Sequence, residues 1–128
     1  MRAKFASILS FAAGMVLVSA GAAAHHGAAV VYNLNETLHI SGTVTDFQFV
    51  NPHVLVFFEV TAENGDSVVW SAGLTSPNRL ARSDGLRRDS VKVGDEVTIS
   101  GAPARSGAPS LWALQVVLNG TPLLGERE

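Results

Sequence analysis

The sequence predicts an all-β fold, a small five-stranded OB-like barrel with one short helix between the third and fourth strands. Five segments between residues 37 and 118 are rich in Val, Ile, Thr and aromatic residues, as strands are. Asn-Gly, Gly-Asp and proline-containing segments, which are typical of turns, separate these strands. The lone helix signal falls between the third and fourth strands, an order that favours an OB barrel over a small β-sandwich.

The first strand is expected over residues 37–49 and is interrupted by a change of phase. Its apolar residues occupy even positions as far as Val44 and odd positions from Phe47 onward. Because side chains alternate between the two faces of a strand, this change predicts a β-bulge near Thr45 and Asp46. A long and bulged first strand is the element that lets a small barrel turn a corner.

The second and third strands, residues 53–62 and 67–74, are predicted to form a hairpin. Asn64-Gly65 lies between them, and both residues tolerate the positive φ that tight hairpin turns require. Trp70 lies among valines at strand spacing. We therefore expect Trp70 in the core rather than in a stacking platform for ligands, which is the alternative for an OB fold.

A short helix and two further strands complete the predicted barrel. Ser76 is a typical N-cap and Pro77 suits the first helical position, while Gly85 marks the expected end of the helix. The fourth strand is expected over residues 96–100, where apolar and polar residues alternate. Residues 111–118 are predicted to be the fifth strand.

Residues 1–24 have the features of a secretory signal peptide. Arg2 and Lys4 precede an apolar run, and a small-x-small pattern ends at Ala24. Cleavage after Ala24 predicts a periplasmic or secreted protein, with no stable membrane insertion of the mature chain. The alternative is an uncleaved leader that anchors the domain. The barrel domain is then expected over residues 25–120, followed by a flexible C-terminal tail over residues 121–128.

Charge and cysteine content narrow the classes of partner. The leader holds two basic residues and no acidic ones, so the mature chain would carry seven basic and eleven acidic residues, a net charge of −4. This balance argues against nucleic acid, whose recognition generally rests on clustered Lys and Arg. The chain has no cysteine, which excludes disulfides, thiolate metal sites and cysteine nucleophiles.

Three histidines form a candidate metal site. After cleavage the chain would begin with His25 and His26, which offer ring nitrogens beside a free α-amine. Cu(II) has the highest affinity for nitrogen ligands among the divalent metals, so copper is the expected ion. His53 is the best third ligand because it follows Asn51-Pro52, a predicted turn that we expect to be a ligand-binding loop. The alternative is that His53 only shapes this loop.

Catalysis has little support in the sequence. No serine lies in a Gly-x-Ser-x-Gly motif, and no glycine-rich phosphate loop is present. We therefore predict no catalytic residues and no enzymatic activity.

Several segments together resemble a family of small exported bacterial proteins with no assigned function. The resemblance implies a single periplasmic OB-like barrel and supplies no ligand. Gly73 departs from the family pattern, in which glutamate is common at this position, and this leaves His53 without an obvious carboxylate partner. The segments that carry the resemblance are His25-His26-Gly27, Gly42-Thr43-Val44, Val50-Asn51-Pro52-His53, Trp70, Ser76-Pro77-Asn78-Arg79-Leu80, Arg88-Asp89-Ser90, Gly94-Asp95-Glu96-Val97 and Gly101-Ala102-Pro103-Ala104.

The function expected from these observations is a periplasmic, non-catalytic binding or accessory module that binds copper through His25, His26 and His53. Its partner would be an envelope protein or a small ligand. The alternative is a structural or protein-interaction domain of the cell envelope with no metal role.

Overall fold

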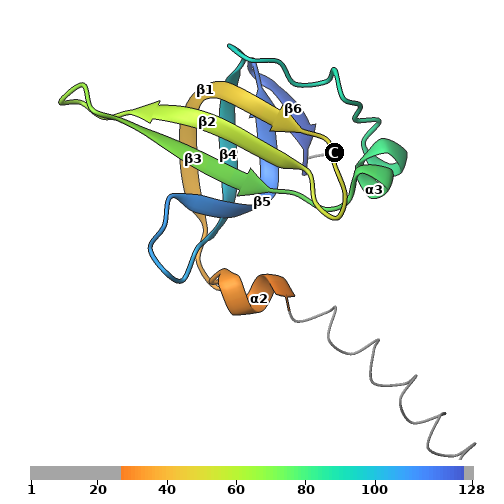
Figure 1. Cartoon of the computed structure of the whole chain (residues 1–128), viewed down its shortest axis with the longest axis horizontal. Coiled ribbons are helices and arrows are strands. Elements are labelled where there is room, and N and C mark those ends of the chain that lie inside the picture. Colours follow the sequence, from red (N-terminus) through yellow and green to blue (C-terminus); the bar gives the residue numbers. More distant parts are fainter. Residues whose placement is uncertain (1–26, 126–128) are drawn as a thin grey trace, which may run out of the picture. The chain divides into compact units, whose positions relative to one another are not determined.

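A computed structural model describes residues 27–125, which contain two short helices and six strands (Figure 1). The chain divides into two compact units, Met1–Val31 and Tyr32–Glu128. The first contains the five-residue helix α2, Gly27–Val31, and the second contains the β-barrel. The barrel elements are β1 (Leu38–Gln48), β2 (Leu55–Thr61), β3 (Ser67–Gly73), α3 (Pro77–Ser83), β4 (Glu96–Pro103), β5 (Ser110–Leu118) and β6 (Thr121–Leu124).

Five strands close into a mixed barrel, which confirms the predicted fold class. The strand order is β3-β2-β1-β4-β5-β6, and all neighbours in this order are antiparallel. The first residues of β5 also pair in parallel with the last residues of β3, from Ser71 opposite Ser110 to Gly73 opposite Trp112. This parallel pairing closes the barrel, and we call it the β3–β5 seam.

The bulge predicted in the first strand is present. The pairing of β1 with β2 shifts register between Val44 and Asp46, so that Thr45 is the extra residue. Beside the bulge, a Cβ atom added to Gly42 would overlap the backbone carbonyl oxygen of Glu59 on β2. The two strands therefore approach closely at a position that only glycine fits.

The core lies inside the barrel and is built from alternate residues of each strand. Phe58 on β2 is fully buried, and Trp70, its partner on β3, is half-buried and packs against the core cluster. The prediction that Trp70 belongs to the core is therefore confirmed. The largest fully buried side chains are those of Phe58, Leu74, Leu80, Leu86, Ile99 and Leu111.

Helix α3 begins and ends where its capping signals predict. Ser76 is the N-cap, and its hydroxyl accepts a hydrogen bond from the backbone N–H of Arg79 at 3.4 Å. Pro77 is the first helical residue, and Gly85 follows the helix with a φ of +69°. Pro77 and Leu80 are buried, so this short helix is fixed to the barrel by two apolar residues.

Part of the predicted tail, residues 121–124, forms a sixth strand that the sequence analysis does not predict. Thr121–Leu124 form β6, which pairs with the end of β5 through a turn at Asn119-Gly120, where both residues have positive φ. Leu123 and Leu124 are half-buried against the core, which holds the strand in place. Residues 126–128 lie outside the described part of the chain.

Candidate functional site

The β1–β2 loop, residues 49–54, lies at one end of the barrel and is fixed where it enters β2. The backbone of Val54 exchanges hydrogen bonds with the segment after β3, accepting one from Leu74 at 2.8 Å. The Asn51–Pro52 peptide bond is cis, and both residues are exposed. The predicted ligand loop is thus a defined turn at the surface.

His53 contacts Trp112, an aromatic residue distant in sequence, and Trp112 in turn contacts Tyr32. Its ring lies perpendicular to that of Trp112, with 5.2 Å between ring centroids. The ring of Tyr32 lies on Trp112 as well, at 6.0 Å and a tilt of 42°. His53 is exposed, whereas Tyr32 and Trp112 are half-buried. We call these three residues the ring cluster.

Trp112 reaches the outer surface because of strand alternation and the absence of a side chain at Gly73. Leu111 and Ala113 point into the core, so Trp112 between them points out of the barrel. Gly73 is its partner across the β3–β5 seam, and a Cβ atom there would lie 3.2 Å from Trp112 Cε3. The indole therefore occupies the space that a side chain at position 73 would take.

A row of hydroxyl groups runs along the seam beside the ring cluster. The hydroxyl of Ser71 donates to that of Ser110 at 3.0 Å, and Ser110 Oγ lies 3.3 Å from the hydroxyl of Tyr32. Ser71 and Gly73 alternate with the buried Ala72, so these hydroxyls share the outer face with Trp112. Polar hydrogen-bonding groups thus adjoin the aromatic rings.

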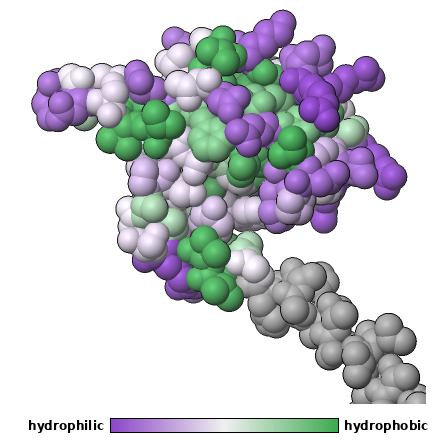
Figure 2. All heavy atoms as spheres, viewed as in Figure 1, coloured by the Kyte–Doolittle hydropathy of each residue, from purple (hydrophilic) through white to green (hydrophobic). Residues whose placement is uncertain are grey.

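The outer face of β2 and β3 continues this surface away from the seam. Phe57 is half-buried there, and Val69 is 50% exposed. Figure 2 shows apolar side chains on the β2–β3 hairpin next to its polar tip. Strands β2, β3 and β5 contain no Lys or Arg. We call this surface the seam face: the ring cluster with Phe57, Val69, Ser71 and Ser110.

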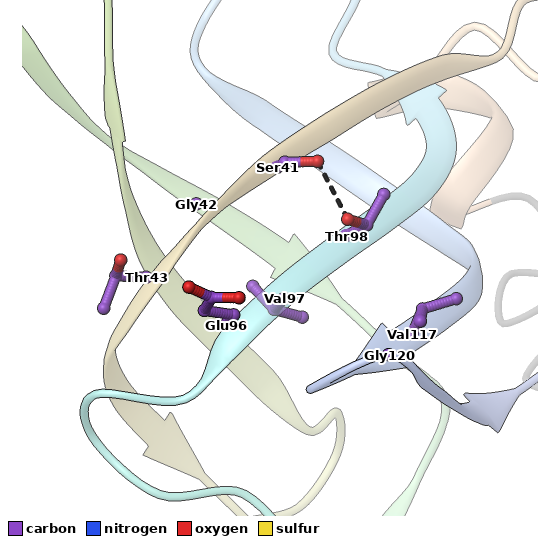
Figure 3. A pocket seen from close by; sticks show the side chains of 8 residues that line it. All are labelled: Ser41, Gly42, Thr43, Glu96, Val97, Thr98, Val117 and Gly120. Carbon is purple, nitrogen blue, oxygen red and sulfur yellow. Dashed lines mark hydrogen bonds between the residues drawn. The ribbon is translucent and has the colours of Figure 1, made fainter.

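The outer face of β1, β4 and β5 is different in character, because it is polar. A shallow groove of about 520 Å³ crosses it, and the hydroxyls of Ser41 and Thr98 hydrogen-bond there at 2.8 Å (Figure 3). On the same two strands His39 Nδ1 bonds to Ser100 Oγ at 2.6 Å. His39 is exposed. Thr43 and Glu96 also line this groove.

A second groove, of about 690 Å³, lies between the β1–β2 loop, α3 and the segment that follows α3. Figure 1 shows α3 and this loop at the same end of the barrel. We call it the arginine groove because Arg87 and Arg88 are its only cations. Its lining residues are Phe49, Val50, Asn51, Pro77, Asn78, Ala81, Leu86, Arg87, Arg88 and Asp89.

Of the three predicted metal ligands, the structure describes His53 alone. His25 and His26 lie outside the described residues, as does the predicted leader, residues 1–24. Between residues 27 and 125, no three His, Cys, Asp or Glu side chains are grouped as a metal ion would require. Within the same range no helix combines the length and apolar character needed to cross a membrane.

Sequence reasoning missed Trp112 and Tyr32, which place His53 in a cluster. For Trp112 a signal was present, because a bulky aromatic residue between two inward-facing apolar residues of a strand must point outward. Tyr32 has no comparable signal. It reaches the seam through an isolated bridge to Ala104, a contact between segments 72 residues apart.

Comparison with solved structures agrees with an OB-like fold through the match to Rim1. Rim1, a mitochondrial single-stranded-DNA-binding protein from S. cerevisiae, matches with a TM-score of 0.50 and 13% identity, over 65% of this chain and 92% of Rim1. The N-terminal domain of PriB from Thermoanaerobacter tencongensis matches with a TM-score of 0.47 and 18% identity, over 66% of this chain and 96% of that domain. A comparison with curated protein sequences yields no match. A family model matches residues 13–111, and the chain therefore belongs to the family of unknown function DUF6152.

Proposed function

We propose that the protein is an exported, non-catalytic binding module whose ligand contacts the seam face. The observation that carries this proposal is the ring cluster, in which His53 and Tyr32 flank an outward-facing Trp112. OB folds generally bind ligands on the outer face of their second and third strands, beside the loop between the first two strands. The ring cluster lies at that loop, and Phe57 and Val69 extend the surface along β2 and β3.

The chemistry of the seam face favours an uncharged, ring-bearing ligand of the carbohydrate class. Aromatic rings pack against the apolar faces of sugar rings, and the hydroxyls of Ser71 and Ser110 would exchange hydrogen bonds with sugar hydroxyls. Nucleic acid is disfavoured because its phosphates require Lys and Arg, which β2, β3 and β5 lack. The net charge of −2 for the whole chain also disfavours the binding of nucleic acid.

The side chains of the seam face support binding rather than catalysis. A serine nucleophile needs a base within hydrogen-bonding reach. Ser71 donates its hydroxyl to Ser110, so the hydroxyls bond to one another. Within residues 27–125 the ring of His53 has an aromatic neighbour and no hydrogen-bond partner.

The test is a fluorescence titration with two probes, chitotriose and the oligonucleotide dT12. The chain has two tryptophans, Trp112 on the seam face and Trp70 facing inward. We expect chitotriose to change the tryptophan emission and dT12 to leave it unchanged. Trp112→Ala should abolish the response, and Trp70→Phe, the matched control, should preserve it.

Three results would contradict the proposal. A response to chitotriose that survives in Trp112→Ala would place the ligand elsewhere. Binding of dT12, or no response to chitotriose, would overturn the carbohydrate assignment, and indifference to both probes favours the structural envelope domain instead.

Copper binding is the second candidate function, and one observation favours it. His53 is exposed, and no residue between 27 and 125 hydrogen-bonds to its ring nitrogens, so the imidazole is available as a ligand. His25 and His26 would supply the remaining nitrogens from the new N-terminus. Because His53 lies against Trp112, bound Cu(II) should quench the fluorescence of that indole.

The copper hypothesis is tested by titrating the mature protein with Cu(II). We expect weaker binding for His25→Ala, for His53→Ala and for a form with one extra N-terminal residue, which displaces the α-amine. Equal affinity for the wild type, His25→Ala and the extended form would exclude a site at the terminal amine.

A further inference from the structure

We infer that the arginine groove is a second binding site, for an amphiphilic organic anion that carries one carboxylate on an apolar body. No residue of the seam face lines this groove, so the inference is independent of the seam face. Its volume of about 690 Å³ falls in the range of small-molecule sites.

The anion would be held by two arginines whose guanidinium groups are available. Arg87 and Arg88 are exposed, and neither side chain forms an ion pair or hydrogen bond with another residue between 27 and 125. A guanidinium group matches a carboxylate with two parallel hydrogen bonds. Asn51 and Asn78 add amide groups on the same groove, and both are exposed.

The apolar part of the ligand would lie on a hydrophobic floor. Leu86 is 1% exposed and Pro77 is buried, so packing against the rest of the domain fixes both side chains. Val50, by contrast, is 43% exposed on the loop side of the groove. An apolar ligand would remove the side chain of Val50 from water.

The arginines are held in position by the segment that carries them. The backbone N–H of Arg87 donates to Ser90 Oγ at 2.8 Å, and the N–H of Ser90 donates to the carbonyl oxygen of Arg87 at 3.1 Å. The buried Leu86 and Val91 flank this turn. Little conformational entropy of the backbone is therefore lost when a ligand binds.

The charge of the groove selects a single carboxylate. Asp89 lines the groove beside the two arginines, so the net charge of the lining is +1 on a chain of net charge −2. A monoanion neutralises that charge, whereas a second negative group would meet Asp89. Phosphate-rich ligands such as nucleic acids are disfavoured for the same reason.

The probes that test this inference are octanoate, 1-octanol and acetate, with binding followed by amide chemical shifts in the full protein. We expect octanoate to bind more tightly than either of the others, because only octanoate has both the charge and the chain. Its dissociation constant should rise at least about tenfold in the double variant Arg87→Gln/Arg88→Gln, since charge-assisted hydrogen bonds are lost.

The matched control is Arg79→Gln/Arg82→Gln, which removes the same charge from exposed positions of α3 outside the groove lining. We expect this control to change the dissociation constant less than about twofold, as exposed charges at a distance are screened. A further variant, Ala81→Glu, places a carboxylate in the groove and should weaken octanoate binding while the helix is preserved.

Several outcomes would overturn the inference. Unchanged octanoate binding in Arg87→Gln/Arg88→Gln would show that the two arginines do not bind the carboxylate. If acetate binds as tightly as octanoate, the groove recognises the negative charge alone. If 1-octanol binds as tightly as octanoate, the groove recognises the apolar chain alone. Tighter binding of a decaglutamate peptide at Arg87 and Arg88 would assign the groove to an acidic protein segment.

Discussion

Two glycines in the strands of the barrel are required by close contacts of different kinds. At Gly42 the obstacle to a side chain is backbone, the carbonyl oxygen of Glu59 on the neighbouring strand. At Gly73 the obstacle is the indole of Trp112, whose Cε3 and Cζ3 atoms would lie 3.2 and 3.4 Å from an added Cβ. A half-buried side chain yields more easily than a paired strand, so the two positions should differ in tolerance.

We therefore expect Gly42→Ala to lower the free energy of unfolding by about 3 kcal/mol and Gly73→Ala by about 1 kcal/mol. Urea unfolding measures both losses of stability. Equal m values for the wild type and the variants would show that the shifts in midpoint report changes in stability. Gly73→Ala should also alter the near-UV circular dichroism of Trp112, because the indole must tilt to make room. A larger loss for Gly73→Ala than for Gly42→Ala would contradict this account of the two contacts.

Residue-scale signals explain which parts of the site the sequence could predict. The Asn51-Pro52 turn and the exposed His53 follow from local chemistry, and both were predicted. The packing of His53 on Trp112 depends on the parallel pairing of Gly73 with Trp112, two residues 39 positions apart. No local pattern encodes that pairing, so the ring cluster emerges only in the folded barrel.

At the scale of elements, the strands and the helix follow from local rules. The phase change at Val44 predicted the bulge in β1, and the Ser76-Pro77 cap predicted the start of α3. Strand β6 was missed because its four residues include Pro122 and show no alternation. It forms because the Asn119-Gly120 turn folds it back along β5.

Truncation tests the contribution of β6. A chain ending at Gly120 should lose about 2 kcal/mol of stability, since Leu123 and Leu124 cover the core and each half-buried leucine contributes about 1 kcal/mol. A chain ending at Gly125 should match the full protein in urea unfolding. Equal stability of the two truncated chains would show that residues 121–124 do not stabilise the barrel.

At the scale of the whole molecule, Asp95 joins segments that are far apart in the sequence. Its carboxylate accepts hydrogen bonds from the backbone N–H of Lys92 at 2.8 Å and from the Asn119 side chain at 3.1 Å. Its backbone carbonyl accepts one from the N–H of Val44 at 2.9 Å. The start of β4 is thereby tied to β1 and to the β5–β6 turn.

The two hydrogen bonds to its carboxylate lower the pKa of Asp95 below its ordinary value of 3.8. The hydrogen bond from the backbone of Lys92 has the larger effect, and that from Asn119 the smaller. A lowered pKa in the folded state stabilises the protein above the unfolded pKa, and this contribution disappears as the pH falls through the folded value. The stability difference between the wild type and Asp95→Asn should therefore be largest above about pH 5 and shrink below it. A difference that is constant from pH 7 to pH 2 would contradict this role.

The whole molecule presents three surfaces of different chemistry: the polar face of β1, β4 and β5, the aromatic seam face and the arginine groove. The β1–β2 loop contributes His53 to the seam face and Val50 and Asn51 to the arginine groove, which makes this loop the centre of the proposed binding activity. The chain has four histidines and no cysteine, so the proposed copper site would use nitrogen ligands and no thiolate.

The most direct test of the proposed binding activity is an NMR titration with chitotriose, followed at the two indole N–H signals. There are two such signals because the chain has two tryptophans. We expect the Trp112 signal to shift in a saturable manner while the Trp70 signal, from the inward-facing ring, stays in place. A stationary Trp112 signal at saturating chitotriose, or a shift confined to Trp70, would contradict the assignment of the seam face as the ligand site.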